Sequence, residues 1–115
     1  MEKLFDAELR LMEIIWDKEP ISAKEISIIA DSEFGWNKNT TYTVIKRLIE
    51  KNVLRREEPG FLCSSLVKRS EVQKSETKTL IEKLFGGSKR AFFAAFSDED
   101  LSPDEIEAIR SLIEK

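Results

Sequence analysis

Apolar residues recur every three or four positions along the first fifty residues, a spacing that is typical of amphipathic α-helices. We predict three helices here, because three helix-start residues divide this part of the chain: Asp6, Ser22 and Asn37. Ser22 is followed three residues later by Glu25, which completes the form of a capping box. Three helices with one apolar face each can enclose a single small core. The predicted faces are, in helix order, Leu9, Met12, Ile15 and Trp16; Ile26, Ile29 and Ala30; and Thr41, Val44, Ile45, Leu48 and Ile49.

The pattern changes after Asn52, a residue that can take the left-handed conformation at the end of the third helix. Two short runs that favour β-structure, residues 53–57 and 61–67, flank the turn Glu58-Pro59-Gly60. Such runs around a Pro-Gly turn predict a β-hairpin. Three helices followed by a hairpin is the order of a winged helix-turn-helix. The predicted fold class is therefore mainly α with a small β-hairpin.

The rest of the chain is predicted to be helical again. Gly86-Gly87 separates a long helix from a short one that runs to about Phe96. The start signals of the three predicted helices are Ser70 with Gln73, Ser88, and Ser102-Pro103 with Glu105. We therefore expect two parts: a winged-helix DNA-binding domain, residues 1–69, followed by a three-helix arm, residues 70–115.

The arm has more large apolar side chains than three short helices can bury among themselves. We expect a homodimer, because a two-fold partner covers such a face with the same face of a second copy. The alternative is a monomer in which the arm folds back on residues 1–67. The side chains expected in the dimer interface are Val72, Leu80, Ile81, Leu84, Phe85, Phe92, Phe96, Ile106, Ile109, Leu112 and Ile113.

Composition excludes several classes of protein. The chain has 115 residues, no histidine and one cysteine, Cys63. A zinc ribbon, a Cys-His pair and a Ser-His-Asp triad are therefore excluded, and we expect no enzyme, no cofactor and no metal site. Cys63 is expected to be a packing residue. No apolar run approaches the roughly 20 residues of a membrane span, and no signal peptide is recognisable, so we expect a cytoplasmic protein without direct membrane association.

Charge is unevenly distributed along the chain. Residues 36–56 contain six basic side chains and one acidic side chain, whereas residues 1–35 contain four basic and nine acidic ones. A basic segment inside an acidic chain is a candidate surface for DNA phosphates. The alternative for charge alone is a solvated helix face.

The polar face of the third helix has suitable chemistry for reading DNA. Asn39, Thr43 and Lys46 can reach base edges in a major groove, and Tyr42 offers a flat ring to a thymine methyl or a sugar. In the hairpin, the two arginines either hold backbone phosphates or form surface pairs across the strands with Glu57 and Glu58. A winged helix that only docks to proteins is the alternative function. The predicted DNA contacts are Asn37, Lys38, Asn39, Thr40, Tyr42, Thr43, Lys46, Arg47, Arg55 and Arg56.

Several segments match one known family in their order and spacing. They are Asp6-Ala7-Glu8-Leu9 with Ile15-Trp16, Ser22-Ala23-Lys24-Glu25-Ile26, the run from Gly35 to Leu48, Lys51-Asn52-Val53-Leu54, Phe85-Gly86-Gly87-Ser88, and Glu99-Asp100-Leu101-Ser102-Pro103-Asp104-Glu105-Ile106. Over nearly its full length the chain resembles the BlaI/MecI-type penicillinase repressors, which are winged-helix transcriptional repressors.

The resemblance implies a homodimer that represses transcription on a dyad operator with TACA/TGTA-like half-sites. It implies DNA contacts from Asn37 through Lys46 and from the hairpin, and dimerisation through residues 70–115. In well-known members a membrane sensor protease triggers cleavage of an Asn-Phe pair in the fifth helix. That pair falls here at Ala94-Ala95, or at Ala95-Phe96 with a one-residue slip. Where the family often has a basic residue after the hairpin glycine, this chain has Phe61.

Overall fold

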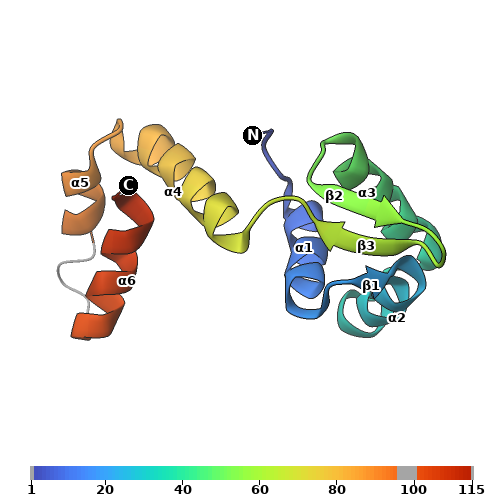
Figure 1. Cartoon of the computed structure of the whole chain (residues 1–115). Coiled ribbons are helices and arrows are strands. Elements are labelled where there is room, and N and C mark those ends of the chain that lie inside the picture. Colours follow the sequence, from blue (N-terminus) through green and yellow to red (C-terminus); the bar gives the residue numbers. More distant parts are fainter. Residues whose placement is uncertain (1, 96–100, 115) are drawn as a thin grey trace. The chain divides into compact units, whose positions relative to one another are not determined.

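The computed structural model describes residues 2–95 and 101–114 (Figure 1). The chain divides into two compact units between Lys68 and Arg69. The first, here called the N-terminal unit, contains three helices and a small sheet. The second, the C-terminal unit, contains helices only in its described residues. The predicted fold class, mainly helical with a small β component, is confirmed.

The N-terminal unit has the predicted order of helices followed by a hairpin. Its elements are α1 (Asp6–Lys18), β1 (Ile21–Ser22), α2 (Ala23–Phe34), α3 (Lys38–Glu50), β2 (Leu54–Glu57) and β3 (Leu62–Ser65). The sheet has three antiparallel strands in the order β1-β3-β2, so the prediction of a hairpin alone omitted one strand. That strand is only two residues long: Ile21 pairs with Cys63, and Ser22 with Leu62.

The first helix buries a face that is slightly rotated from the predicted one. Met12 and Ile15 are buried as expected, but Leu11 and Ile14 are buried too, whereas Leu9 is only half-buried. The reason is that α1 contacts both α3 and β3, which together cover a wider part of the α1 surface than one row of apolar side chains. Apolar side chains of α2, α3 and the sheet complete this core, among them Ile21, Ala23, Ile26, Ala30, Ile45, Leu48, Leu54 and Cys63.

Two of the three predicted helix starts are correct. Ser22 Oγ accepts a hydrogen bond from the backbone N–H of Glu25, and Asn37 Oδ1 accepts one from Thr40. Asp6, however, is the first helical residue rather than the cap. The cap position is Phe5, whose N–H donates to the Glu8 carboxylate, so an acidic side chain inside the helix satisfies the free amide.

The C-terminal unit contains α4 (Arg69–Phe85), α5 (Lys89–Ala94) and α6 (Pro103–Ile113). Ser88 and Ser102 cap α5 and α6 as predicted, and Glu105 closes the capping box of α6. Ser70 does not cap α4, because the helix already begins at Arg69. Phe96, the predicted end of the short helix, lies outside the described residues.

The five residues of α4 that are predicted for the dimer interface do not all lie on one side of the helix, because Val72 is opposite Ile81. Val72 and Ile81 are buried, Phe85 is half-buried, and Leu80 and Leu84 are 42% and 66% exposed. The physical reason is helical geometry. At about 100° per residue, the nine positions from Val72 to Ile81 turn the side chain to the opposite face.

Two observations bear on other protein classes. Among residues 2–95 and 101–114, no three acidic or cysteine side chains come together as a metal site would require. No helix in the described part of the chain is long and apolar enough to cross a bilayer.

Candidate nucleic-acid interface

The third helix has one face in the core and the opposite face open to solvent. Thr41, Val44, Ile45 and Leu48 are buried, as the sequence predicts, and Ile49 is half-buried. The predicted base-reading residues Asn39, Thr43 and Lys46 are exposed on the other side of the helix. Thus α3 is fixed to the N-terminal unit by its apolar face and leaves its polar face free.

The start of α3 is also open to solvent. Asn37, Lys38, Asn39 and Thr40 are all exposed. The Asn37 side chain accepts from the Thr40 N–H at 2.8 Å, and this bond fixes the direction in which the helix begins. The first turn of a helix has N–H groups that no intrahelical carbonyl reaches, and these favour a negatively charged group such as phosphate.

Thr43 has a defined hydrogen-bond state. Its hydroxyl donates to the Asn39 backbone carbonyl, one turn earlier, at 2.8 Å. This bond uses the donor of the hydroxyl and leaves its lone pairs and the methyl group facing solvent. In this rotamer Thr43 can accept from a cytosine or adenine amino group, or contact a thymine methyl.

Three cations on and beside the exposed face of α3 are available to phosphates. Lys38, Lys46 and Arg47 form no ion pair with any carboxylate in residues 2–95 and 101–114. Lys51, which also belongs to the basic segment, is different. Its ammonium lies 2.7 Å from Glu8 Oε1 and donates to the Lys3 carbonyl at 2.8 Å, so it serves the fold.

The two arginines of the hairpin are paired along their own strand. Arg55 contacts the Glu57 carboxylate and Arg56 contacts that of Glu58, and all four side chains are about half exposed. The predicted alternative of pairing across strands is therefore wrong in its geometry. Residues two apart on a strand point to the same side, which places Arg55 beside Glu57. Glu58 is the first residue after β2 and reaches Arg56 from the turn. These exposed pairs are worth little to stability.

An aromatic row joins the hairpin to α3, and sequence analysis did not predict it. The Phe61 ring meets the Tyr42 ring edge-on, with centroids 5.9 Å apart. The guanidinium carbon of Arg56 lies 3.6 Å from the Phe61 centroid, and the Lys38 ammonium lies 5.7 Å from the Tyr42 centroid. The sequence does show an aromatic residue, Phe61, directly after the turn glycine. No regular spacing along the chain, however, predicts that it contacts Tyr42.

The sheet is tied to the helices at both ends. At the turn end, the Phe61 carbonyl accepts from the Ala23 N–H at 3.0 Å. At the other end, the Trp16 indole N–H lies within hydrogen-bond distance of Ser65 Oγ and the Val67 carbonyl, at 3.0 and 3.1 Å. These contacts join the sheet to α2 and α1, and the contact between Phe61 and Tyr42 places the hairpin beside α3.

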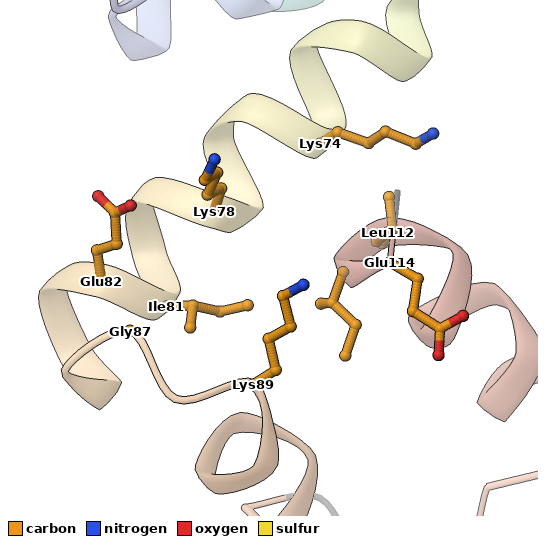
Figure 2. A pocket seen from close by; sticks show the side chains of 9 residues that line it. Lys74, Lys78, Ile81, Glu82, Gly87, Lys89, Leu112 and Glu114 are labelled. Atoms are coloured by element: carbon orange, nitrogen blue, oxygen red, sulfur yellow. The ribbon is translucent and has the colours of Figure 1, made fainter.

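The predicted dimer residues are dispersed over the C-terminal unit. Ile81 from α4 and Leu112 and Ile113 from α6 line a pocket of about 210 Å³, with Lys89 beside them (Figure 2). Phe85 and Phe92 form an edge-on pair with centroids 5.6 Å apart. Leu80, Leu84 and Ile106 are exposed, whereas Ile109 is half-buried. Phe96 lies outside the described residues.

Comparisons with known proteins agree on one family. A family model described as penicillinase repressor matches residues 4–115. The penicillinase repressor of Staphylococcus aureus is 32% identical over 110 residues, covering 93% of this chain and 87% of that protein. The methicillin resistance regulatory protein MecI of Mammaliicoccus sciuri is 33% identical over 116 residues, covering 98% and 94%.

A solved structure is also similar. It is the monomeric form of Bacillus licheniformis BlaI in complex with the blaP half-operator. The TM-score is 0.55 at 28% sequence identity, and the match covers 61% of this chain and 88% of the other.

Proposed function

The chain belongs to the penicillinase repressor family of transcriptional repressors, and from this premise we propose that it binds a dyad operator as a homodimer and thereby blocks transcription. The observation that carries the proposal is the exposed polar face of α3. Its opposite face is buried, and its cations Lys38, Lys46 and Arg47 form no ion pair within the described residues. A related repressor solved with its half-operator supports DNA as the partner.

In the proposed complex, α3 enters the major groove. Asn39, Thr43 and Lys46 contact base edges, because their side chains are on the face away from the core. The remaining predicted contacts hold the backbone and set the position of the helix: Asn37, Lys38, Thr40, Tyr42, Arg47, Arg55 and Arg56. A protein acting on operator DNA would work in the cytoplasm.

The C-terminal unit is proposed to join two copies. Its described residues bury few side chains completely, only Val72 and Ile81, and leave Leu80, Leu84 and Ile106 exposed. An isologous contact covers such residues with their equivalents on the partner. Two α3 helices are then held about one turn of DNA apart, as two half-sites require.

Release from DNA is proposed to follow loss of this dimer, through cleavage by a sensor protease or through another signal. Ala94 is the last residue of α5 and Ala95 caps the helix, and both are exposed. The alternative cleavage position, Ala95-Phe96, includes a residue outside the described part of the chain.

The proposal is tested by the salt dependence of binding to duplex DNA that carries a TACA/TGTA dyad. If four cations per protomer contact phosphates, a dimer makes about eight contacts, and log affinity falls with log salt with a slope near −7. A slope near zero, or no binding at low salt, would remove the case for a DNA-binding repressor.

Two variants separate base reading from general attraction. Lys46→Ala should weaken binding without unfolding the protein, and Thr43→Ala should reduce the preference for one base position by about 1–3 kcal/mol. Lys83→Ala, at an exposed lysine of α4, is the matched control and should leave binding unchanged.

A further inference from the structure

The hairpin from β2 to β3, here called the wing, contains an arginine that has both a carboxylate partner and an aromatic partner. Arg56 is paired with the carboxylate of Glu58 and also stacks on Phe61, with its guanidinium carbon 3.6 Å from the ring centroid. Arg55 has the equivalent pair with Glu57 but no ring beneath it among the described residues. The chain therefore offers two neighbouring arginines on opposite faces of β2, both paired with a carboxylate, of which Arg56 has a ring beneath it.

Stacking leaves the hydrogen-bonding edge of a guanidinium unused. The ring covers the flat face of the Arg56 group, whereas its N–H donors point outwards in the plane and fit carboxylates and phosphates equally well. Only Nε is bonded to Glu58 in the structure. Arg56 can therefore exchange Glu58 for a phosphate while it stays on the Phe61 ring.

Phe61 is itself fixed to the helices on either side of the wing. Its carbonyl accepts from Ala23 at the start of α2, and its ring contacts Tyr42 in α3. Its backbone N–H donates to Glu58 Oε1 at 3.2 Å. Because Phe61 has these anchors, a side chain stacked on it has a defined position relative to α3.

We propose that Phe61 is a positioning residue that directs Arg56 towards a DNA phosphate beside the groove occupied by α3, and that Glu58 is an internal competitor for the same arginine. The inference rests on the proposed DNA-binding function. It predicts that the wing binds DNA only after a carboxylate has been exchanged for a phosphate. Glu58 would thus lower affinity for every sequence to the same extent.

Glu58 remains negatively charged under physiological conditions. The hydrogen bond from Arg56, and then that from the Phe61 backbone, hold the pKa of its carboxyl below the ordinary value. The competing charge is therefore present at neutral pH, and an amide is the appropriate replacement, because it keeps the shape and the acceptor oxygen for Phe61.

The test measures binding of the full chain to short duplex DNA of random sequence by fluorescence anisotropy, over a range of salt concentrations. Glu58→Gln should bind about two- to fivefold more tightly for each wing in contact with DNA, the size expected for release of one surface ion pair. Its salt slope should be steeper by up to about one per wing. Glu57→Gln is the matched control, and its gain should be smaller.

A double-mutant cycle then tests the role of the ring. Phe61→Leu keeps an apolar side chain but removes the flat surface, so it should weaken binding and abolish the gain from Glu58→Gln. Circular dichroism and thermal unfolding of each variant show whether the fold is kept.

The outcomes separate this inference from the proposed function. Equal gains from Glu57→Gln and Glu58→Gln would show that only net charge matters and would overturn the role of Phe61. No gain from Glu58→Gln would overturn the competition. If the unaltered chain binds no DNA at low salt, the proposed function itself fails and this inference fails with it.

Discussion

At the scale of single residues, Glu8 of the N-terminal unit is a buried carboxylate that needs a positively charged partner. It is only 1% exposed, and one of its oxygens accepts from both Lys51 and the Phe5 N–H at 2.7 Å. The second oxygen, Oε2, is buried and lacks a hydrogen-bond partner in the described residues. A buried carboxylate of this kind depends on its counter-charge, because water cannot replace the missing partner.

Replacing Lys51 should therefore be costly. Lys51→Met keeps much of the aliphatic side chain but leaves the Glu8 charge unpaired, and we expect a loss of about 3 kcal/mol in the free energy of unfolding, measured with urea. The Glu8→Gln/Lys51→Met double variant is the control and should recover at least half of this loss. A cost below about 1 kcal/mol for the single variant would contradict the assigned role of the pair.

Cys63 predicts a pH dependence of stability. Burial raises the pKa of its thiol from 9.0 to about 11, although Arg56 acts in the opposite direction. Between these values the unfolded chain loses the thiol proton while the folded chain keeps it, so unfolding becomes easier as pH rises. The loss of stability begins near pH 9, where the thiol of the unfolded chain ionises, and reaches roughly 2–3 kcal/mol by about pH 11.

The measurement compares urea unfolding of the unaltered chain and of Cys63→Ala between pH 8 and pH 11. Tyrosine and lysine groups titrate in both proteins, so their effects cancel in the difference between the two curves. That difference should narrow as pH rises. Parallel curves would mean that the thiol ionises equally easily in the folded and unfolded chains.

At the scale of elements, α3 packs into the core with one face and is proposed to bind DNA with the other. Asn37, at the start of the helix, contributes to both roles. Its side chain caps the helix through Thr40, and its exposed position is at the end where a phosphate is expected. The two roles respond differently to charge. Aspartate caps a helix as well as asparagine does, but it repels a phosphate.

Two substitutions at Asn37 distinguish these roles. Asn37→Ala should lower the free energy of unfolding by about 1 kcal/mol, because the cap is lost. Asn37→Asp should keep the stability and still weaken DNA binding, with chemical denaturation and a binding titration as the two measurements. If Asn37→Asp binds as tightly as the unaltered chain, no phosphate approaches this end of α3.

Most elements and the polar face of α3 follow from the sequence, because both depend on local spacing. Ser22, Asn37, Ser88 and Ser102 cap helices through side chains a few positions away, and such signals are visible in sequence. The contacts that sequence analysis did not predict join distant segments. Phe61 meets Tyr42, and β1 pairs with β3, through three-dimensional packing for which the chain has no periodic pattern.

At the scale of the whole molecule, the two units differ in how completely they bury their apolar side chains. The N-terminal unit encloses most of the buried core, including Leu11, Ile15 and Ile26, whereas Leu84 in α4 is 66% exposed. A unit with its own core can fold independently, and exposed apolar side chains such as Leu84 can be covered by a partner. We therefore expect the contacts that stabilise the proposed dimer to come from the C-terminal unit.

Leu84→Asp should dissociate the proposed dimer without unfolding the N-terminal unit. A charge in an apolar interface costs at least about 2–3 kcal/mol, so the variant should sediment as a monomer and lose operator affinity. Thr79→Asp introduces the same group about 140° around the helix and should remain dimeric. A Leu84→Asp protein that still sediments as a dimer would move the interface elsewhere.

Both tryptophans of the chain, Trp16 and Trp36, lie in the N-terminal unit. Intrinsic tryptophan emission is consequently a local optical probe, whereas ellipticity at 222 nm sums the helices of both units. Superimposable emission and ellipticity curves would indicate that the two units unfold in one cooperative step. Separated curves would give each unit its own transition, so the natural placement of two indoles makes domain coupling measurable without any added label.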